Sequence, residues 1–373
     1  MKKISLRDFP SAKDRREFLE NKLNIKLENI SNFSFSEEQV NGRNIENLIG
    51  TTQIPLGIAG PIMNRYIPLA TTEGALVASI SRGCKAVTEA GGVKVFVEDV
   101  GQTRGPVFKI KDLEHGMKVK AWIENNFKLL YSVTKKNSSH LELLNLKVAL
   151  VGKSIFVRFS YRTGDAMGMN MVTIATEQAV SLIEKETGAK CIALAGNFDI
   201  DKKAAWLNFI EGRGKKVWAE IVLPEKIVRE ILKTTPEKIV EVVKRKTHLG
   251  SIMSGSLSFN SHFANIVAAI FLATGQDPAH VVEGSLGITD AEVEKNKDLY
   301  FSIYMPSIQI GTVGGGTHLP TQMEALKIMQ VKSVLEYAQV LGAAVLAGEL
   351  SLIASLSEGS LAKAHLKLGR KGK

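Results

Sequence analysis

Glu73 is the residue whose setting most suggests chemistry. It lies in the string TTEG at 71–74, where the other residues are small or apolar, and Arg82, Lys85 and Arg104 are cations that follow it. A charge in an uncharged neighbourhood is costly unless it is paired. Such groups are candidates for shifted pKa values and for catalysis. Glu73 is therefore the first candidate for acid–base work.

Three other charged positions have both an ordinary and a chemical interpretation. Asp201, Lys202 and Lys203 are consecutive in GNFDIDKK, which is typical of a solvated loop. Asp277, in TGQDPAH, has the position of a helix cap or a turn residue. His365 lies near a basic terminus, where a histidine is usually a surface residue. From the residues alone these ordinary interpretations stay open.

Two glycine-rich strings could hold phosphates. GDAMGMNM at 164–171 opens a predicted helix, whose free N–H groups and dipole attract anions, and GTVGGGT at 311–317 lets the backbone approach a ligand closely. Taken alone, each is equally typical of a turn and a cap. No G-x-G-x-x-G follows a predicted strand, since GRGKKV at 212–217 fails at its last position, so a Rossmann domain is not expected.

Composition sets further bounds. The 373 residues suffice for two domains. There are two cysteines, which have neither CxxC spacing nor a histidine cluster nearby. They therefore argue against a disulfide scaffold or a metal site, and they fit a reducing cytoplasm. The net charge of +10 suits phosphate-bearing ligands, although the last eleven residues supply part of it. No nucleic-acid-binding motif accompanies it. Polar residues interrupt the longest uncharged stretch, 247–276, so neither a membrane span nor a signal peptide is expected.

The pattern of elements predicts an α+β protein. Residues 1–40 are expected to form a short helical N-terminal region, and a helix is expected over 73–90 from a cap at 71–73. Residues 105–195 follow the order β-α-β-β-α-β, which is ferredoxin-like. We expect this small domain to be inserted in a large helix-rich domain made of 41–104 and 196–373.

The strings taken together resemble the catalytic domain of 3-hydroxy-3-methylglutaryl-coenzyme A (HMG-CoA) reductase, of the class I type found in archaea and eukaryotes. The resemblance runs from about Glu46 to His365 and rests on ENLIGT, PLGIAGP, TTEG, SRGCKA, GQTRGP, GNFDIDKK and TGQDPAH. It implies reduction of HMG-CoA to mevalonate and free coenzyme A with two NADPH. It also implies that the large domain binds substrate and the small domain the nicotinamide cofactor.

The resemblance assigns roles residue by residue. Lys202 would stabilise the oxyanion, Asp277 would bridge Glu73 and Lys202, and His365 would protonate the departing thiolate. The implied substrate-binding residues are Arg82, Arg104, Asp201, Lys203, Lys246, His262 and Asn265. The implied cofactor-binding residues are Ser139, His140, Asp165, Met167, Gly168, Met169, Asn170, Gly315 and Gly316. Ala195 stands where animal enzymes have serine, so one substrate hydrogen bond is missing or replaced.

Partners and alternatives complete these expectations. Family members form a homodimer or a dimer of dimers whose shared active site brings Lys202 to Glu73 and Asp277 of the partner. NADPH is expected, with NADH the alternative, because Ser139-His140 stands where NADPH-using relatives have Ser-Arg and histidine is only partly charged near neutrality. Two other classes remain: a non-catalytic basic nucleotide- or RNA-binding protein, and an acyl-CoA thioester hydrolase.

Overall fold

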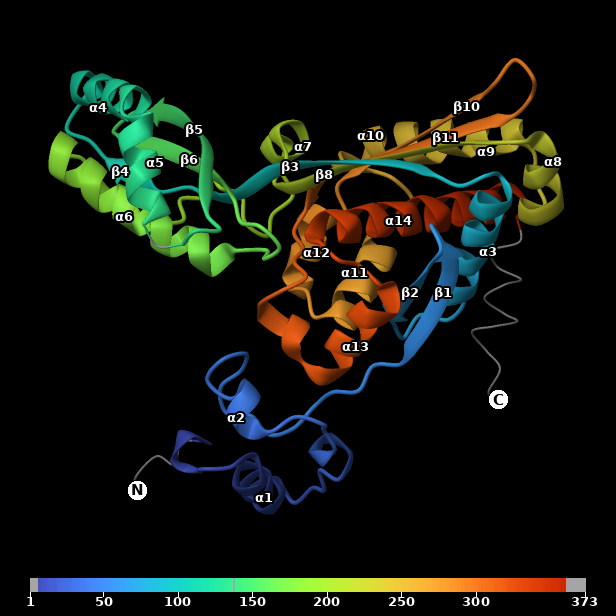
Figure 1. Ribbon diagram of the computed structural model, residues 1–373, viewed down its shortest axis with the longest axis horizontal. Coiled ribbons are helices and arrows are strands. Elements are labelled where there is room, and N and C mark those ends of the chain that lie inside the picture. Colours follow the sequence, from blue (N-terminus) through green and yellow to red (C-terminus); the bar gives the residue numbers. More distant parts are fainter. Residues whose placement is uncertain (1–5, 137, 360–373) are drawn as a thin grey trace.

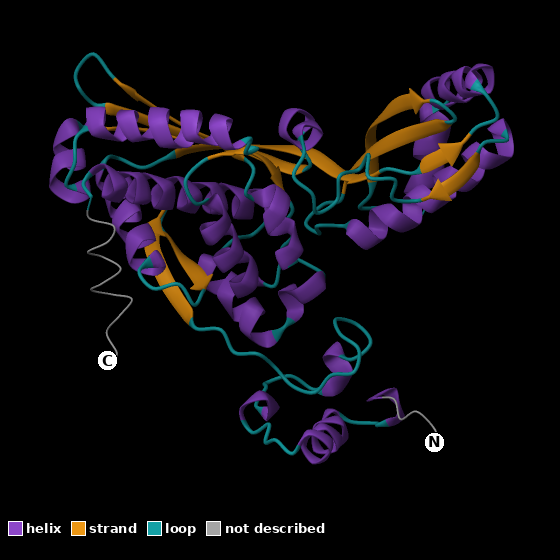
Figure 2. Ribbon diagram, turned by 180° about the vertical axis from the view of Figure 1, so that it is seen from behind, coloured by secondary structure: helices purple, strands orange, loops and turns teal. Residues whose placement is uncertain are grey.

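The computed structural model describes residues 6–136 and 138–359, and it shows the mixed helix-and-sheet architecture expected from the sequence (Figures 1 and 2). The chain begins with a mostly helical region connected to the rest by an extended segment (Figure 1), and this region contacts the large half through Leu319 and through the Asn44 Nδ2, which donates to the carbonyl of Gly315. Its elements are η1 (Leu6–Asp8), α1 (Ala12–Leu23), η2 (Asn29–Ser31) and α2 (Glu37–Val40). Helix α1 begins at Ala12 because Ser11 and Asp14 form a capping box.

A long mixed sheet runs through the rest of the molecule and contains strands of both halves. Its strand order is β7-β4-β6-β3-β8-β11-β10-β9, with β5 paired to β6. The strands are β3 (Lys94–Arg104), β4 (Val107–Lys109), β5 (Glu142–Val151), β6 (Ser154–Arg162), β7 (Lys190–Ala193), β8 (Gly214–Leu223), β9 (Ser258–Phe259), β10 (Gly287–Val293) and β11 (Leu299–Ile308). A separate antiparallel pair is formed by β1 (Leu56–Ile62) and β2 (Arg65–Ala70).

Strand β3 belongs to both halves of this sheet (Figure 1). Residues 94–101 pair with β8, whereas residues 102–104 pair with β6. The register shifts between Asp99 and Gly101, and Gly101 has φ 84, a conformation that favours glycine. The sheet therefore continues without a break from one half of the molecule to the other.

The small half contains the four strands at one end of the sheet and three helices on one of its faces (Figure 2). The helices are α4 (Leu113–Asn125), α5 (Phe127–Lys135) and α6 (Met169–Thr187). Strand order β7-β4-β6-β5 with antiparallel neighbours is the arrangement that a β-α-β-β-α-β chain adopts in ferredoxin-like folds. Its separate core includes Phe108, Phe159 and Tyr161.

The large half is built around α14 (Val334–Ser357), which packs between α3 (Leu76–Glu89), the sheet and α11 (Phe263–Thr274). The other helices are α7 (Trp206–Glu211), α8 (Glu225–Ile227), η3 (Val228–Leu232), α9 (Pro236–Val242), η4 (Val243–Gly250), α10 (Ser251–Ser254), η5 (Pro278–His280), α12 (Val281–Gly284), η6 (Gly315–His318) and α13 (Pro320–Met329). Helix α14 is long and apolar enough to cross a membrane, but 83% of its most apolar window is buried in the fold. It is the core helix of this half.

One detail predicted from the sequence is wrong. Helix α3 begins at Leu76 after Ala75, which has φ 72, rather than at a 71–73 cap; the Thr71 hydroxyl instead accepts the N–H of Glu73 in a turn. The most apolar long helix among the described residues is α14, and the first residues of the uncharged stretch 247–276 complete the π-helix η4. Tertiary contacts decide where a helix starts and where a π-helix forms, and neither a cap motif nor a hydropathy window contains that information.

Candidate active site

Lys202 and Asp277 form the central ion pair of the site. The Lys202 Nζ lies 2.8 Å from the Asp277 Oδ2, and both side chains remain partly exposed. The hydrogen bond to Asp277 raises the pKa of Lys202, against the opposing effect of burial. Burial pushes the pKa of Asp277 upward, but the bonds from Lys202 and the Ala279 N–H outweigh it and the pKa falls. An ammonium held in this way can stabilise a developing oxyanion.

The contact corrects one expectation. Lys202 meets Asp277 of its own chain, whereas the family resemblance placed Asp277 on a partner subunit. The two residues approach because Asp277 precedes η5 at the end of α11, next to the loop that carries Lys202.

The loop before Lys202 is held in an unusual backbone conformation. Asn197, Ile200 and Lys202 all have positive φ, with φ 56 at Lys202. The Asn208 Nδ2 donates to the carbonyl of Ile200 at 3.0 Å, and the buried Arg158 donates to the carbonyl of Asp199 at 3.1 Å. Non-glycine residues persist in this region only where the surroundings hold them, and such strain concentrates at functional sites.

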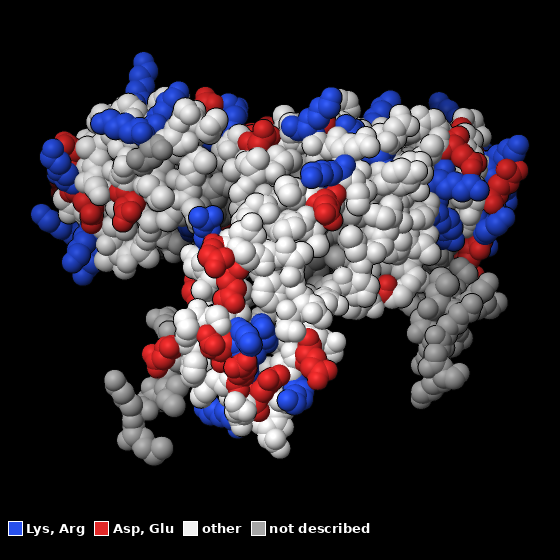
Figure 3. Space-filling model, turned by 60° about the horizontal axis from the view of Figure 1, so that its bottom comes forward, with Lys and Arg blue, Asp and Glu red and all other residues white. Residues whose placement is uncertain are grey.

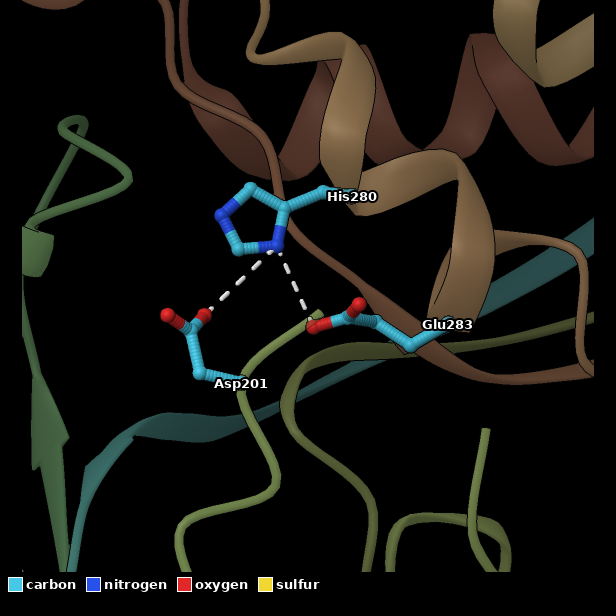
Figure 4. Close-up of side chains that lie close together, drawn as sticks. All are labelled: Asp201, His280 and Glu283. Atoms are coloured by element: carbon cyan, nitrogen blue, oxygen red, sulfur yellow. Dashed lines mark hydrogen bonds and ion pairs between the residues drawn. The ribbon is translucent and has the colours of Figure 1, made fainter. Parts of the chain in front are cut away.

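A buried charge cluster lies beneath the ion pair. Arg213 and Glu283 are fully buried and bond to each other, and the Arg213 Nη2 also lies 2.9 Å from Asp201. His280, also fully buried, places its Nδ1 3.1 Å from the Glu283 Oε1 (Figure 4). The sequence analysis identified Asp201 but missed Arg213, His280 and Glu283. The only signal was their polarity within EGRGK and DPAHVVE, beside predicted site residues.

Asp201, His280 and Glu283 are close enough together to hold a metal ion (Figure 4). However, the Arg213 guanidinium already bonds both carboxylates. A cation there would have to compete with a buried guanidinium, so the cluster is an arginine-neutralised network rather than a metal centre.

Glu73 belongs to a second group of residues. Its Oε2 accepts a hydrogen bond from the Asn265 Nδ2 at 2.8 Å. Asn265 lines a cavity of about 340 Å³ together with two other predicted substrate residues, Lys246 and His262, and several serines. The buried Nε2 of His262 has no hydrogen-bond partner among the described residues. The cavity is thus lined mainly by polar side chains, of the kinds that orient a substrate in a pocket.

A third group lines a cleft of about 630 Å³ between the two halves of the molecule. Its walls are the loop and first turn of α6 at 166–171 and the loop at 311–317, and Asp277 lies in the same cleft. The predicted cofactor residues that line it are Met167, Gly168, Met169, Asn170, Gly315 and Gly316. No side chain caps the N-terminus of α6, so its first N–H groups are available to an anion.

Several predicted ligand-binding residues are engaged elsewhere. Arg82 donates to Ser351 and Ser355 of α14, and burial lowers its pKa. Arg104 bonds Asp199 at 3.2 Å and the Thr173 hydroxyl. In this conformation each guanidinium bonds within the protein, so that Arg82 links α3 to α14 and Arg104 links β3 to α6.

Asp165 also bonds within the protein: its carboxylate accepts the Val334 N–H at 2.8 Å, at the start of α14. Ser139 and His140 lie exposed in the turn before β5, outside the residues that line the cleft, although His140 approaches Gly164 at its edge. The Lys203 Nζ donates to the carbonyl of Asp201 at 3.1 Å. His365 lies outside the described residues.

The fold and this arrangement define an enzyme-like site. It combines a lysine–aspartate pair, a polar substrate-sized cavity and a glycine-lined cleft at the junction of two halves. The sequence matches the model of the hydroxymethylglutaryl-coenzyme A reductase family over residues 11–370, and the chain belongs to that family.

Two archaeal relatives show how far the similarity extends. The 3-hydroxy-3-methylglutaryl-coenzyme A reductase of Methanothermobacter thermautotrophicus is 50% identical over 368 residues, covering 95% of this chain and 92% of the relative. The reductase of Methanocaldococcus jannaschii is 50% identical over 373 residues, with the same two coverages.

A solved structure shows the same fold. The class II 3-hydroxy-3-methylglutaryl-CoA reductase from Streptococcus pneumoniae, bound to NADPH in open conformations, superimposes with a TM-score of 0.72. It is 17% identical, and the match covers 95% of this chain and 100% of that one. At this identity the similarity concerns the fold alone.

Proposed function

We propose that this protein is an HMG-CoA reductase, which reduces HMG-CoA by four electrons to mevalonate and coenzyme A with two NADPH. The observation that carries the proposal is the Lys202–Asp277 pair, 2.8 Å apart, beside the cleft lined by residues 166–171 and 311–317. Family membership over residues 11–370 supports it.

The residues have complementary tasks in this reaction. NADPH, when bound, supplies the hydrides. The Lys202 ammonium stabilises the negative charge that develops on the thioester oxygen and later on the aldehyde oxygen. Glu73, oriented by Asn265, delivers a proton to the product oxygen, and His365 protonates the coenzyme A thiolate. Lys246, His262 and Asn265 form the wall that receives the acyl portion.

The proposed cofactor is NADPH, with NADH as the alternative. The S. pneumoniae structure contains NADPH. In this chain, the uncapped α6 N-terminus provides for the diphosphate, and Figure 3 shows basic side chains around the outer surface of the small half. Ser139 and His140 would be the contacts to the 2′-phosphate. The small domain of 105–195 is thus the proposed cofactor domain, and the large domain of 41–104 and 196–373 the proposed substrate domain.

The proposed type is class I, and the proposed setting is a cytoplasmic homodimer or dimer of dimers that takes part in isoprenoid synthesis. Identity of 50% to the two archaeal reductases, against 17% to the class II enzyme, supports the class. The cavity beside Glu73 and the cleft beside Asp277 have no lining residue in common, which supports a site completed by a second subunit.

A spectrophotometric assay tests this function. Adding HMG-CoA to the protein should oxidise two equivalents of NADPH per coenzyme A released, and parallel runs with NADH rank the cofactors. Glu73→Gln should bind HMG-CoA but lose about 100-fold or more in mevaldehyde reduction, because the proton donor is gone. Unchanged mevaldehyde turnover in this variant would remove Glu73 from the role.

The same assay separates the alternatives. A thioester hydrolase would release coenzyme A without oxidising NADPH. A nucleotide- or RNA-binding protein would do neither and would bind polyanions with an affinity that falls steeply with salt.

A further inference from the structure

Glu283 lies beneath the Lys202–Asp277 pair, and none of the roles described above uses it. It is fully buried on α12, and its Oε1 is the shared acceptor of three donors. These are the Arg213 Nη1, the His280 Nδ1 at 3.1 Å and the backbone N–H of Lys202 at 3.2 Å. A buried carboxylate without donors would be strongly disfavoured, so these contacts are required for its burial.

The contact with Lys202 is the informative one. Lys202 has φ 56, a conformation that a side-chain-bearing residue adopts only when its surroundings impose it. The N–H that Glu283 accepts belongs to this same residue, whose ammonium bonds Asp277 at 2.8 Å on the other side. Glu283 therefore holds the backbone N–H of Lys202, while Asp277 holds its ammonium.

The imidazole of His280 lies between the same carboxylate and that of Asp277. Because a carboxylate only accepts, the Nδ1 facing Glu283 carries the proton. The Nε2 then points toward the Asp277 Oδ2, 3.7 Å away, and has no hydrogen-bond partner among the described residues. The imidazole thus separates the two carboxylates and fills the space beneath the ion pair.

We propose that Glu283 is a positioning residue: with His280 and Arg213 it holds the backbone of Lys202 in the left-handed conformation that points the ammonium at Asp277 and the reacting oxygen. The proposal rests on the reductase function proposed above. A displacement of the ammonium by about 1 Å can cost about 100-fold in rate, so the effect belongs in kcat rather than in ligand binding.

Glu349 provides a matched control. It is also a fully buried glutamate that accepts backbone N–H groups, those of Ser261 and, at 3.0 Å, His262. It supports the wall of the Glu73-side cavity rather than Lys202. General damage from neutralising a buried carboxylate would affect both variants alike, whereas positional effects would differ.

The experiment compares Glu283→Gln with Glu349→Gln in the full-length protein. Glu283→Gln should lower kcat by about 10- to 100-fold while the KM values for HMG-CoA and NADPH stay within about threefold of wild type. Glu349→Gln should mainly raise the KM for HMG-CoA. A kcat for Glu283→Gln within about twofold of wild type, or a KM increase like that of Glu349→Gln, would overturn the proposal.

Hydrogen–deuterium exchange supplies a readout without activity. The peptide containing residues 197–203 should exchange faster in Glu283→Gln than in wild type or Glu349→Gln, because the Lys202 N–H loses its charged acceptor. Unchanged exchange there contradicts the positioning role even if the wild-type protein reduces nothing. Absence of reduction with altered exchange would refute the function alone. If Glu283→Gln does not fold, His280→Leu replaces it, with the same expected direction in exchange and kcat.

Discussion

The chemistry of this site depends on how each charged side chain is partnered. Lys202 and Asp277 are partly exposed, and Asp277 lines the cleft, whereas Arg213 and Glu283 are fully buried. The sequence could identify Lys202 and Asp277 only through their family motifs. It could not identify Arg213, His280 or Glu283, since a polar residue in EGRGK or DPAHVVE looks the same whether it is a turn residue or part of a buried network. Nor could it show that Arg104 bonds Asp199.

The ion pair predicts a defined pH dependence of stability. The lowered pKa of Asp277 means that its contribution is present above the unfolded-state value of about 3.9 and is lost as the pH falls through the folded-state value. The raised pKa of Lys202 means that its contribution is present below about 10.4 and is lost as the pH rises through the folded-state value. The pair should therefore stabilise the protein steadily from about pH 5 to 9.

Asp277→Asn tests this dependence, because asparagine keeps the oxygen that caps the Ala279 N–H. Both partners are partly exposed, so the loss at pH 7 should not exceed about 1 kcal/mol. Urea unfolding between pH 7 and 3 should show the difference from wild type shrinking as the pH falls. Asp112→Asn, which alters the cap of α4, is the control. A difference that grows toward low pH would contradict the assigned pKa direction.

At the scale of elements, the cleft is formed by loops that approach their neighbours closely because glycines at the contacts have no side chain. The periodic helices and the alternating strands were predictable because burial imposes their patterns. The start of α3 and the π-helix η4 were not, since tertiary contacts decide them. Gly275 shows such a contact: it ends α11 with φ 72, and a Cβ there would lie 2.3 Å from the carbonyl oxygen of Gly316. The 311–317 loop can therefore rest on the end of α11 only if residue 275 lacks a side chain.

Gly275→Ala should displace this loop and weaken NADPH binding by about 10-fold or more. Its free energy of unfolding should fall by about 2–5 kcal/mol, the sum of left-handed strain and overpacking. Gly188→Ala is the matched control: Gly188 also ends a helix, with φ 71, but a Cβ there would meet nothing within 4 Å. The control should lose about 1–2 kcal/mol and keep its NADPH affinity. Equal effects of the two substitutions would show that contact with Gly316 is unimportant.

At the scale of the whole molecule, the predicted catalytic residues fall into two groups. Glu73 lies with Asn265 beside one cavity, and Lys202 lies with Asp277 beside the other. Among the described residues, no hydrogen bond or ion pair joins Glu73 to Lys202. The mixed helix-and-sheet fold class was predictable from the sequence. The separation was not, because it depends on how α3 and the 197–203 loop are placed around α14.

This separation predicts complementation between inactive subunits. If Glu73 of one subunit completes the Lys202–Asp277 site of another, mixing Lys202→Ala with Glu73→Ala under exchange conditions should restore up to about a quarter of wild-type activity. Half of the dimers would then be hybrids, each with one intact site. Each variant mixed with itself is the control. A lack of recovery, with hybrid formation demonstrated by native mass spectrometry, would show that each chain builds its site alone.

The passage of β3 through both halves has a mechanical consequence. Since β3 changes its pairing partner at Gly101, where the register already shifts, this residue is the natural pivot for any swing of the small half. Asp99 lies next to this position and has a partner in each half. It bonds Lys215 of β8 at 2.8 Å and lies 3.9 Å from Arg162 of β6. A small rotation at Gly101 would displace atoms by an amount that grows with their distance from it, so α4 and the outer strands of the small half would move furthest. Such a rotation would widen the cleft for the exchange of one spent nicotinamide for a fresh one, while Lys202 and Asp277, which both lie in the large half, would stay in place.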